Sequence, residues 1–346
     1  MSLLPRNRII NAISFRSPST VPLRIFAAPG GSYEHGQKLV DLIKDCGHDF
    51  GDFNDLTLPK PPAPEDFDTD GSYHAIKTDE WGTTWEYRIF GVWGHPIGWP
   101  LNDLDELDNY KAPQPPSAEG EEFEKAKTQA DIHRQRYYLL SEGGSIFEKL
   151  HSLRRFEDVL VDIMLDTPQI NRIADIIVQN VEGHVRKSLA LDADAVAFGD
   201  DFGTQTSLLL SLDVWRKFFK PRYKAIFDPV VKAGKKVFFH CCGQMNELFE
   251  DLKDIGVDVI WPQLPLYDLS ELAHRCRDLE LAVELHPDRG DLMQKGKPED
   301  VRKYLHNLVK TFDTISGGSW LYIEIDPGFP WANVQALFKA AMDLRS

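Results

Sequence analysis

The second half of the chain repeats one arrangement of apolar and polar positions. A short apolar run ends in one or two polar or acidic residues, and a longer segment follows in which apolar residues recur every three or four positions. Short apolar runs predict buried strands, and the longer recurrence predicts amphipathic helices. The predicted strands are 195–203, 237–243, 257–263, 281–288 and 319–326. The predicted helices are 210–234 (broken near Pro221), 245–256, 268–279, 297–318 and 329–344.

The first half follows the same rhythm less evenly. Residues 21–26 and 50–53 are predicted as the opening strands, with a helix at 35–46 between them, and 167–185 is a further helix. Alternating strands and helices indicate a parallel sheet covered by helices. We therefore expect an α/β fold, a (β/α)8 TIM barrel in which residues 1–346 form one domain.

Some stretches do not fit the rhythm. Residues 59–72 are rich in proline and acidic residues and are predicted to be a loop. Residues 73–93 alternate as a β-hairpin does, so we expect a hairpin insertion in the N-terminal half. Residues 111–127 are predicted as a proline- and acid-rich connection that leads into a helix. The glycine-rich stretch 27–31 lacks the Lys-Ser/Thr of a phosphate-binding loop and is predicted to be a loop at the barrel mouth.

Composition narrows the class of protein. The net charge is −15, which argues against nucleic acid or an anionic membrane as the main partner, since both need a basic surface. No stretch approaches the ~20 apolar residues of a membrane span, and the first residues do not resemble a signal peptide. Four cysteines are too few for a disulfide scaffold. We expect a cytoplasmic, enzyme-like protein.

Polar residues gather where the predicted strands end, which is where α/β barrels carry their chemistry. They are Asp200, Asp201, His240, Cys242, Glu284, His286, Asp288, Glu324 and Asp326. Because side chains alternate along a strand, His240 and Cys242 should share one face while Cys241 points away.

This pattern leaves alternatives open. His240 and Cys242 suit two ligands of a zinc ion. The alternative is that Cys242 is a small buried residue and His240 a substrate contact with no metal, and two ligands alone do not decide for the metal. Asp200 and Asp201 could cap a helix or act in the site. Glu284 and His286 could touch substrate or support residues that do.

Several motifs, in order, give the chain a family resemblance. They are TDEWG with the hairpin that follows, PLNDLDELDNY with its proline-rich tail, GDDFGTQ with SLDVWRKFFKP, HCCG with GVDVIWPQ, and PWANVQAL. Together they resemble the uroporphyrinogen decarboxylase superfamily, from about residue 20 to 344. This resemblance implies the same α/β barrel.

The superfamily has two relevant branches, and the chain departs from the first. Uroporphyrinogen decarboxylases carry an arginine-containing segment after the first strand, which holds the carboxylates of the substrate. This chain has LRIFAAPGGSYEHG there, and Arg24 lies inside the strand. We therefore expect no decarboxylation of uroporphyrinogen, because its buried carboxylates would lack partners.

The second branch is the cobamide-dependent methyltransferases, in which an H-x-C motif and a later cysteine bind zinc. His240 and Cys242 match the first two ligands. The segment 321–330 should hold the third, but it has no cysteine and instead contains Glu324 and Asp326. The resemblance also implies a corrinoid cofactor on a separate partner protein.

The leading hypothesis is metal-assisted methyl transfer between a small methylated substrate or thiol and a corrinoid protein. It assigns His240, Cys242 and Glu324 to zinc. Its substrate-orienting or acid–base residues are Asp201, Gln205, Glu284, His286 and Asp326. A metal-independent decarboxylase of a small carboxylic acid is the alternative. A non-catalytic barrel that binds a small molecule or a corrinoid protein is a second.

Overall fold

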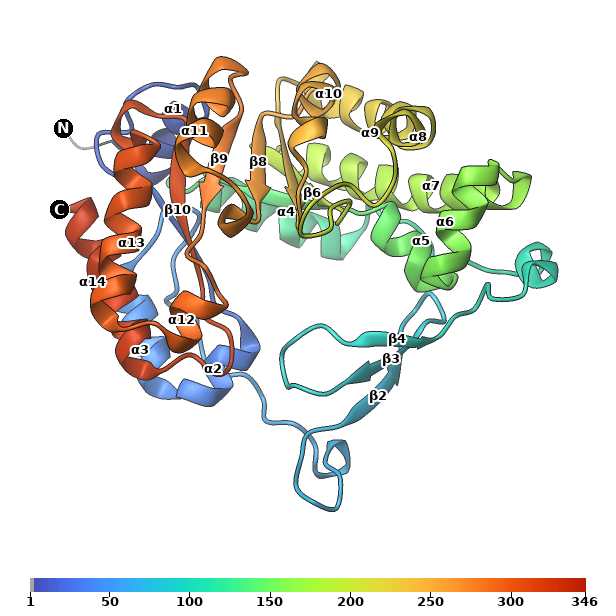
Figure 1. Cartoon of the computed structure of the whole chain (residues 1–346), viewed down its shortest axis with the longest axis horizontal. Coiled ribbons are helices and arrows are strands. Elements are labelled where there is room, and N and C mark those ends of the chain that lie inside the picture. The colour runs from blue at the N-terminus through green and yellow to red at the C-terminus, as the bar shows by residue number, and fades with distance from the viewer. Residues whose placement is uncertain (1–2) are drawn as a thin grey trace.

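A curled parallel sheet forms the centre of the computed structural model, which describes residues 3–346 (Figure 1). Its seven strands lie in the order β1-β10-β9-β8-β7-β6-β5, and each neighbouring pair is parallel. The strands are β1 (Leu23–Phe26), β5 (Leu140–Gly144), β6 (Ala195–Gly199), β7 (Lys236–Cys241), β8 (Val259–Pro262), β9 (Ala282–Leu285) and β10 (Ser319–Glu324). All five strands expected in the second half are confirmed. Parallel pairing brings the carboxyl ends of the strands to one edge of the sheet.

Helices connect these strands and cover the outside of the sheet (Figure 1). They are α1 (Pro5–Ile13), α2 (Pro29–His35), α3 (Gln37–Cys46), α4 (Glu121–Arg134), α5 (Phe147–Leu153), α6 (Phe156–Leu165), α7 (Pro168–Ala190), α8 (Leu212–Phe218), α9 (Lys220–Lys232), α10 (Phe249–Asp254), α11 (Leu269–Asp278), α12 (Asp291–Lys295), α13 (Pro298–Thr311) and α14 (Trp331–Arg345). Short 3-10 turns lie at Pro64–Asp66, Leu104–Asp108, Asn246–Leu248, Leu264–Leu266 and Thr314–Ser316. The predicted helix 210–234 is indeed broken, into α8 and α9. Within residues 3–346, every helix is too short or too polar to cross a membrane.

The two edge strands, β1 and β5, do not pair with each other. The strand expected at 50–53 does not form, and Asp49 bridges the gap instead: its N–H donates to the carbonyl of Leu23 (2.8 Å), and its carbonyl accepts the N–H of Tyr138 (3.2 Å). Among the described residues, the backbone thus joins the two edges of the sheet through Asp49 and not through a ladder. The α/β class is confirmed, but the complete eight-stranded barrel is not.

Strand β5 was not expected from the sequence. Its residues, LSEGG, include a glutamate and two glycines, which weaken the apolar signal of a strand. The strand forms despite its weak apolar pattern because it lies at the edge of the sheet and pairs only with β6. The stretch predicted to be a loop at 27–31 differs too, since Pro29 begins α2 at the position that proline favours in a helix.

The insertion contains a second, antiparallel sheet. β2 (Ala75–Thr78) and β3 (Thr84–Tyr87) form a hairpin inside the predicted range 73–93, and β4 (His95–Gly98) adds a third strand beyond it. Residues 111–120 have no helix or strand before α4 begins. The small sheet is fixed to α5: the hydroxyl of Thr83 donates to the carbonyl of Ser152, and the indole of Trp99 donates to that of His151.

Candidate functional site

The ends of β6 and β7 bring three ligand-type side chains together. Gly199 pairs with His240 across the two strands, so the residues that follow them are neighbours. His240 Nε2 lies 3.4 Å from Cys242 Sγ and 3.7 Å from Asp201 Oδ1. The candidate ligand atoms of these three residues all lie within 4.8 Å of one another, and within residues 3–346 no other histidine, cysteine, aspartate or glutamate group of three meets that criterion.

The ring of His240 is held in one orientation. Its Nδ1 lies 2.8 Å from the carbonyl of Trp261, and its ring lies 4.1 Å from the indole, centroid to centroid. A carbonyl beside Nδ1 fixes the proton on that nitrogen and leaves the lone pair of Nε2 facing Cys242 and Asp201. Metal-binding histidines are oriented in this way by a carbonyl or carboxylate.

The electrostatics of the group favour a bound cation. Burial, and then the charge of Asp201, raise the pKa of the Cys242 thiol to about 12, while burial lowers the pKa of His240. Imidazole is therefore neutral and ready to coordinate at pH 7, whereas the thiol needs a cation to give up its proton. Asp201 Oδ1 also accepts the N–H of Cys242 at 2.7 Å, which holds the carboxylate in place. One nitrogen, one sulfur and one oxygen donor suit zinc with an open fourth position.

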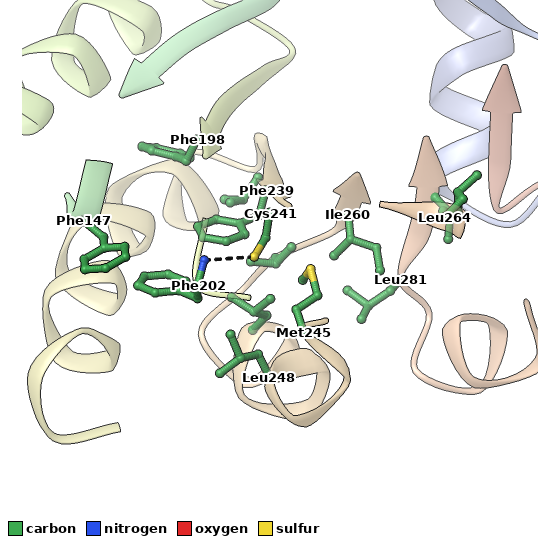
Figure 2. Packing of buried hydrophobic residues seen from close by; sticks show 14 of the residues in the cluster. Phe147, Phe198, Phe202, Phe239, Cys241, Met245, Leu248, Ile260, Leu264 and Leu281 are labelled. Atoms are coloured by element: carbon green, nitrogen blue, oxygen red, sulfur yellow. Dashed lines mark hydrogen bonds between the residues drawn. The ribbon is translucent and has the colours of Figure 1, made fainter. Parts of the chain in front are cut away.

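Cys241 points to the opposite side of β7, as alternation predicted. Figure 2 shows it packed among Phe202, Phe239 and Met245, and it has no exposed surface. Its Sγ accepts the N–H of Phe202 at 3.3 Å. Cys241 is therefore a core residue, and its burial raises the pKa of the thiol well above its usual value.

Asp200 and Asp201 separate into two roles. The buried carboxylate of Asp200 accepts the backbone N–H groups of Ile146, Phe147 and Glu148 at 2.7–2.9 Å. These groups open α5, so Asp200 fixes the start of that helix beside the site. Asp201 faces His240 and Cys242.

The carboxylates at the end of β10 are engaged elsewhere. Glu324 accepts hydrogen bonds from Arg289 (2.5 Å) and from the hydroxyl of Tyr322 (2.9 Å). Asp326 lies 3.1 Å from Arg289, and burial raises its pKa. Neither residue belongs to the group formed by Asp201, His240 and Cys242.

The residues predicted at the end of β9 lie deeper or are held by the backbone. Glu284 is buried, and it accepts hydrogen bonds from Arg24 (2.9 Å) and the indole of Trp320 (2.8 Å). His286 has both ring nitrogens beside backbone carbonyls, those of Pro287 and Pro262, and burial lowers its pKa. Gln205 is exposed on the loop after β6 and lines neither of the cavities described next.

Two cavities share part of their walls at His240. The mouth cavity, about 550 Å³, is lined by residues that include Trp93, Glu148, Lys149, Asp201, His240, Cys242 and Arg289. The inner cavity, about 610 Å³, is lined by residues that include Arg24, Glu142, Lys149, His184, His240, Trp261 and Glu284. Both have Trp93, Ser145, Lys149, Gly199 and His240 in their walls. Each cavity is of a size that suits a small-molecule ligand.

Sequence reasoning missed Lys149, Arg289 and Trp93. Lys149 lies on α5 and Trp93 in the insertion, so neither follows a predicted strand. Arg289 does follow one, directly after Asp288, but a guanidinium is neither a metal ligand nor an ordinary acid–base group, so the pattern at the strand ends does not single it out. The signal that could have found it is the need to neutralise Glu324 and Asp326.

Comparison with known proteins gives a family and a fold. The family model described as Uroporphyrinogen decarboxylase (URO-D) matches residues 96–344. A methyltransferase from Methanosarcina mazei has a similar structure, with a TM-score of 0.63 and 12% identity, over 99% of this chain and 100% of that one. A dihydropteroate synthase from Xanthomonas albilineans reaches a TM-score of only 0.37 at 12% identity, over 57% of this chain and 65% of that one. A search among curated proteins finds no match.

Proposed function

The chain belongs to the uroporphyrinogen decarboxylase family, and we propose that it catalyses metal-assisted methyl transfer between a small methylated substrate or thiol and a corrinoid protein. One observation carries the proposal. Asp201, His240 and Cys242 offer three metal-ligand atoms within 4.8 Å at the mouth of a cavity of small-molecule size.

In this proposal His240, Cys242 and Asp201 hold one zinc ion. Asp201 takes the place in the ligand set that the sequence assigned to Glu324, because the carboxylate of Glu324 is engaged by Arg289. A zinc ion at this position would lower the pKa of a bound thiol, so that the thiolate exists at neutral pH.

The residues around the three ligands keep them in place. The carbonyl of Trp261 orients the imidazole of His240, and the N–H of Cys242 orients the carboxylate of Asp201. Lys149, whose ammonium lies 3.9 Å from Asp79, supplies positive charge to the mouth cavity, where it can orient an anionic part of a substrate. Glu284, His286 and Asp326 support the walls through their own hydrogen bonds and ion pairs.

The arginines that line the cavities are already paired with carboxylates of the protein, which argues against a substrate with many carboxylates. Arg24 is paired with Glu284 inside the sheet, and Arg289 is paired with Glu324 and Asp326. Four carboxylates of a tetrapyrrole would compete with these pairs, and unpaired buried charges are costly. The similar structure from Methanosarcina mazei is a methyltransferase, which supports methyl transfer over decarboxylation of a tetrapyrrole.

The test measures metal content and methyl transfer together. Zinc-supplemented protein is assayed by elemental analysis, and then incubated with methylcobalamin and 2-mercaptoethanol as stand-ins for the corrinoid protein and the thiol. In the expected reaction the methyl group moves from cobalt to sulfur, the thiol proton goes to the buffer, and cob(I)alamin remains. We expect about one zinc per chain and a zinc-dependent loss of methylcobalamin that Cys242→Ala abolishes. Zinc-free protein, or conversion of uroporphyrinogen to coproporphyrinogen, would overturn the proposal.

A further inference from the structure

The connection between β3 and β4 crosses the mouth of the site. We call residues 88–94 the strap; Figure 1 shows this connection extending from the small sheet towards α2. Its base is tight, because a Cβ on Gly94 would lie 2.6 Å from the carbonyl oxygen of Glu86. Trp93 on the strap is 85% exposed, yet it lines both the mouth cavity and the inner cavity. The strap lies outside residues 96–344, which match the family model.

The tip of the strap touches α2 backbone to backbone. Gly91 has φ +74°, and a Cβ there would lie 2.2 Å from the amide nitrogen of Gly30. A Cβ on Gly30 would in turn lie 2.7 Å from the carbonyl oxygen of Phe90. Only glycine on both sides permits this approach. Gly30, the first glycine of the sequence AAPGG, therefore serves close packing against the strap.

Aromatic side chains complete the contact. The ring of Phe90 meets Tyr33 of α2 edge to face at 4.9 Å, and meets Tyr73 of the insertion at 5.7 Å. Within residues 3–346, no hydrogen bond joins the strap to α2. A contact made only of packed surfaces can open and close without leaving buried polar groups unpaired. Contacts of this kind open at low free-energy cost.

We propose that the Gly30–Gly91 contact latches the strap across the mouth, and that Trp93 then decides which molecules reach His240 and Cys242. Small molecules pass beside the indole, and larger ones enter only when the latch opens and the strap swings away. This selection by size goes beyond methyl transfer and does not depend on it, because it concerns access to the cavity and not what is bound there.

The rate at which Cys242 is alkylated measures how easily a reagent enters the mouth cavity. Cys241 and Cys276 are buried and Cys46 is partly exposed, so a Cys46→Ser background leaves Cys242 as the thiol to be alkylated. The protein is first treated with chelator, so that the result does not depend on metal. The rates of alkylation by iodoacetamide, which is small, and by fluorescein-5-maleimide, which is bulky, are compared, with Cys242→Ser to identify the labelled site.

We expect Gly91→Ala to raise the rate for the bulky reagent about tenfold, equivalent to about 1.4 kcal/mol of latch free energy, and the rate for iodoacetamide less than about twofold. Gly30→Ala should raise the bulky rate too, but a Cβ there would also lie 2.7 Å from Pro327, so Gly91→Ala is the more specific test of the latch. Trp93→Ala removes the wall itself and should raise the bulky rate as well. Gly71→Ala is the matched control: Gly71 also has positive φ (+83°), but a Cβ there meets nothing within 4 Å.

The outcomes separate clearly. An unchanged ratio of bulky to small rates in Gly91→Ala, or the same change in Gly71→Ala, would overturn the latch. If Gly91→Ala fails to fold, as judged by circular dichroism, Phe90→Ala decides, because it removes the aromatic contact and leaves the backbone intact. A bulky rate in Phe90→Ala that matches the parent protein would then overturn the proposal, and failure to bind zinc would leave it untouched.

Discussion

Strands β7 and β10 both end in two polar residues spaced two apart. On β7 these are His240 and Cys242, which lie 3.4 Å apart at their side-chain ends with Asp201 beside them. On β10 they are Glu324 and Asp326, and both pair with Arg289. The candidate ligand atoms of the first pair face each other, whereas both carboxylates of the second pair are engaged by one guanidinium.

The difference comes from a third element in each case. At β7, the loop after β6 contributes a carboxylate, which adds an oxygen donor and a negative charge. At β10, the loop after β9 contributes a guanidinium, which occupies the oxygens. The spacing of residues on one strand sets which side chains share a face. What the face can bind depends on the charge that a neighbouring loop brings to it.

Replacing Cys242 is the strongest way to break this comparison. We expect Cys242→Ala to lower zinc affinity by about 100-fold or more, because it removes one of the three proposed protein ligands. Elemental analysis after dialysis should find close to one zinc per chain in the parent protein and almost none in the variant. Cys241→Ala is the matched control and should retain its zinc, since Cys241 packs in the core on the other side of β7. Equal loss of metal in both variants would contradict the assignment.

Replacing each of two carboxylates by its amide tests which one belongs to the proposed zinc site. Asp201→Asn should lower zinc affinity about 10- to 100-fold, while Glu324→Gln should change it less than about threefold, because Arg289 and Tyr322 already occupy Glu324. Competition against a chelator of known zinc affinity gives both values. The reverse ranking would return the third ligand to Glu324, the residue that the sequence favoured.

Glu324 also shows how far the sequence could lead. Apolar runs predicted the five strands from β6 to β10, because each is buried and followed by a polar end. Alternation predicted that His240 and Cys242 share a face and that Cys241 turns away. It could not choose between Asp201 and Glu324, since that choice depends on where Arg289 reaches, which is a tertiary contact.

The two segments for which the sequence predicts strands wrongly lie where the sheet does not close, between β1 and β5. The run 50–53 was predicted to be a strand, but it forms no ladder, and Asp49 makes the only backbone bridge there that the described residues 3–346 show between β1 and the start of β5. Conversely, LSEGG forms the edge strand β5 with little apolar signal. Edge positions bury less surface, so periodicity carries less information about them. The close approach of Gly30 and Gly91 was equally invisible, because the two residues are far apart in the sequence.

The smallest expected effect comes from removing Arg289, whose charge distinguishes the end of β10 from the end of β7. Arg289→Met should destabilise the protein by about 1–2 kcal/mol at pH 7, because it leaves Glu324 and Asp326 without their cation. Arg275→Met is the control: Arg275 pairs with Glu250 on the surface, where an ion pair contributes ~0.5 kcal/mol or less. Urea unfolding gives both free energies.

The pH dependence of this loss distinguishes an ion-pair effect from lost packing. Burial already raises the pKa of Asp326, and removing Arg289, whose charge lowers it, should raise it further. A carboxyl whose pKa is higher in the folded state holds its proton more tightly there, so its contribution to stability falls as the pH rises from the unfolded pKa through the folded one. The deficit of Arg289→Met should therefore be small near pH 4, where Asp326 is protonated in the folded variant, and complete by pH 7. A deficit that is equal at both pH values would mean that Arg289 stabilises the end of β10 by packing alone, and the contrast in charge between the two strand ends would then need another cause.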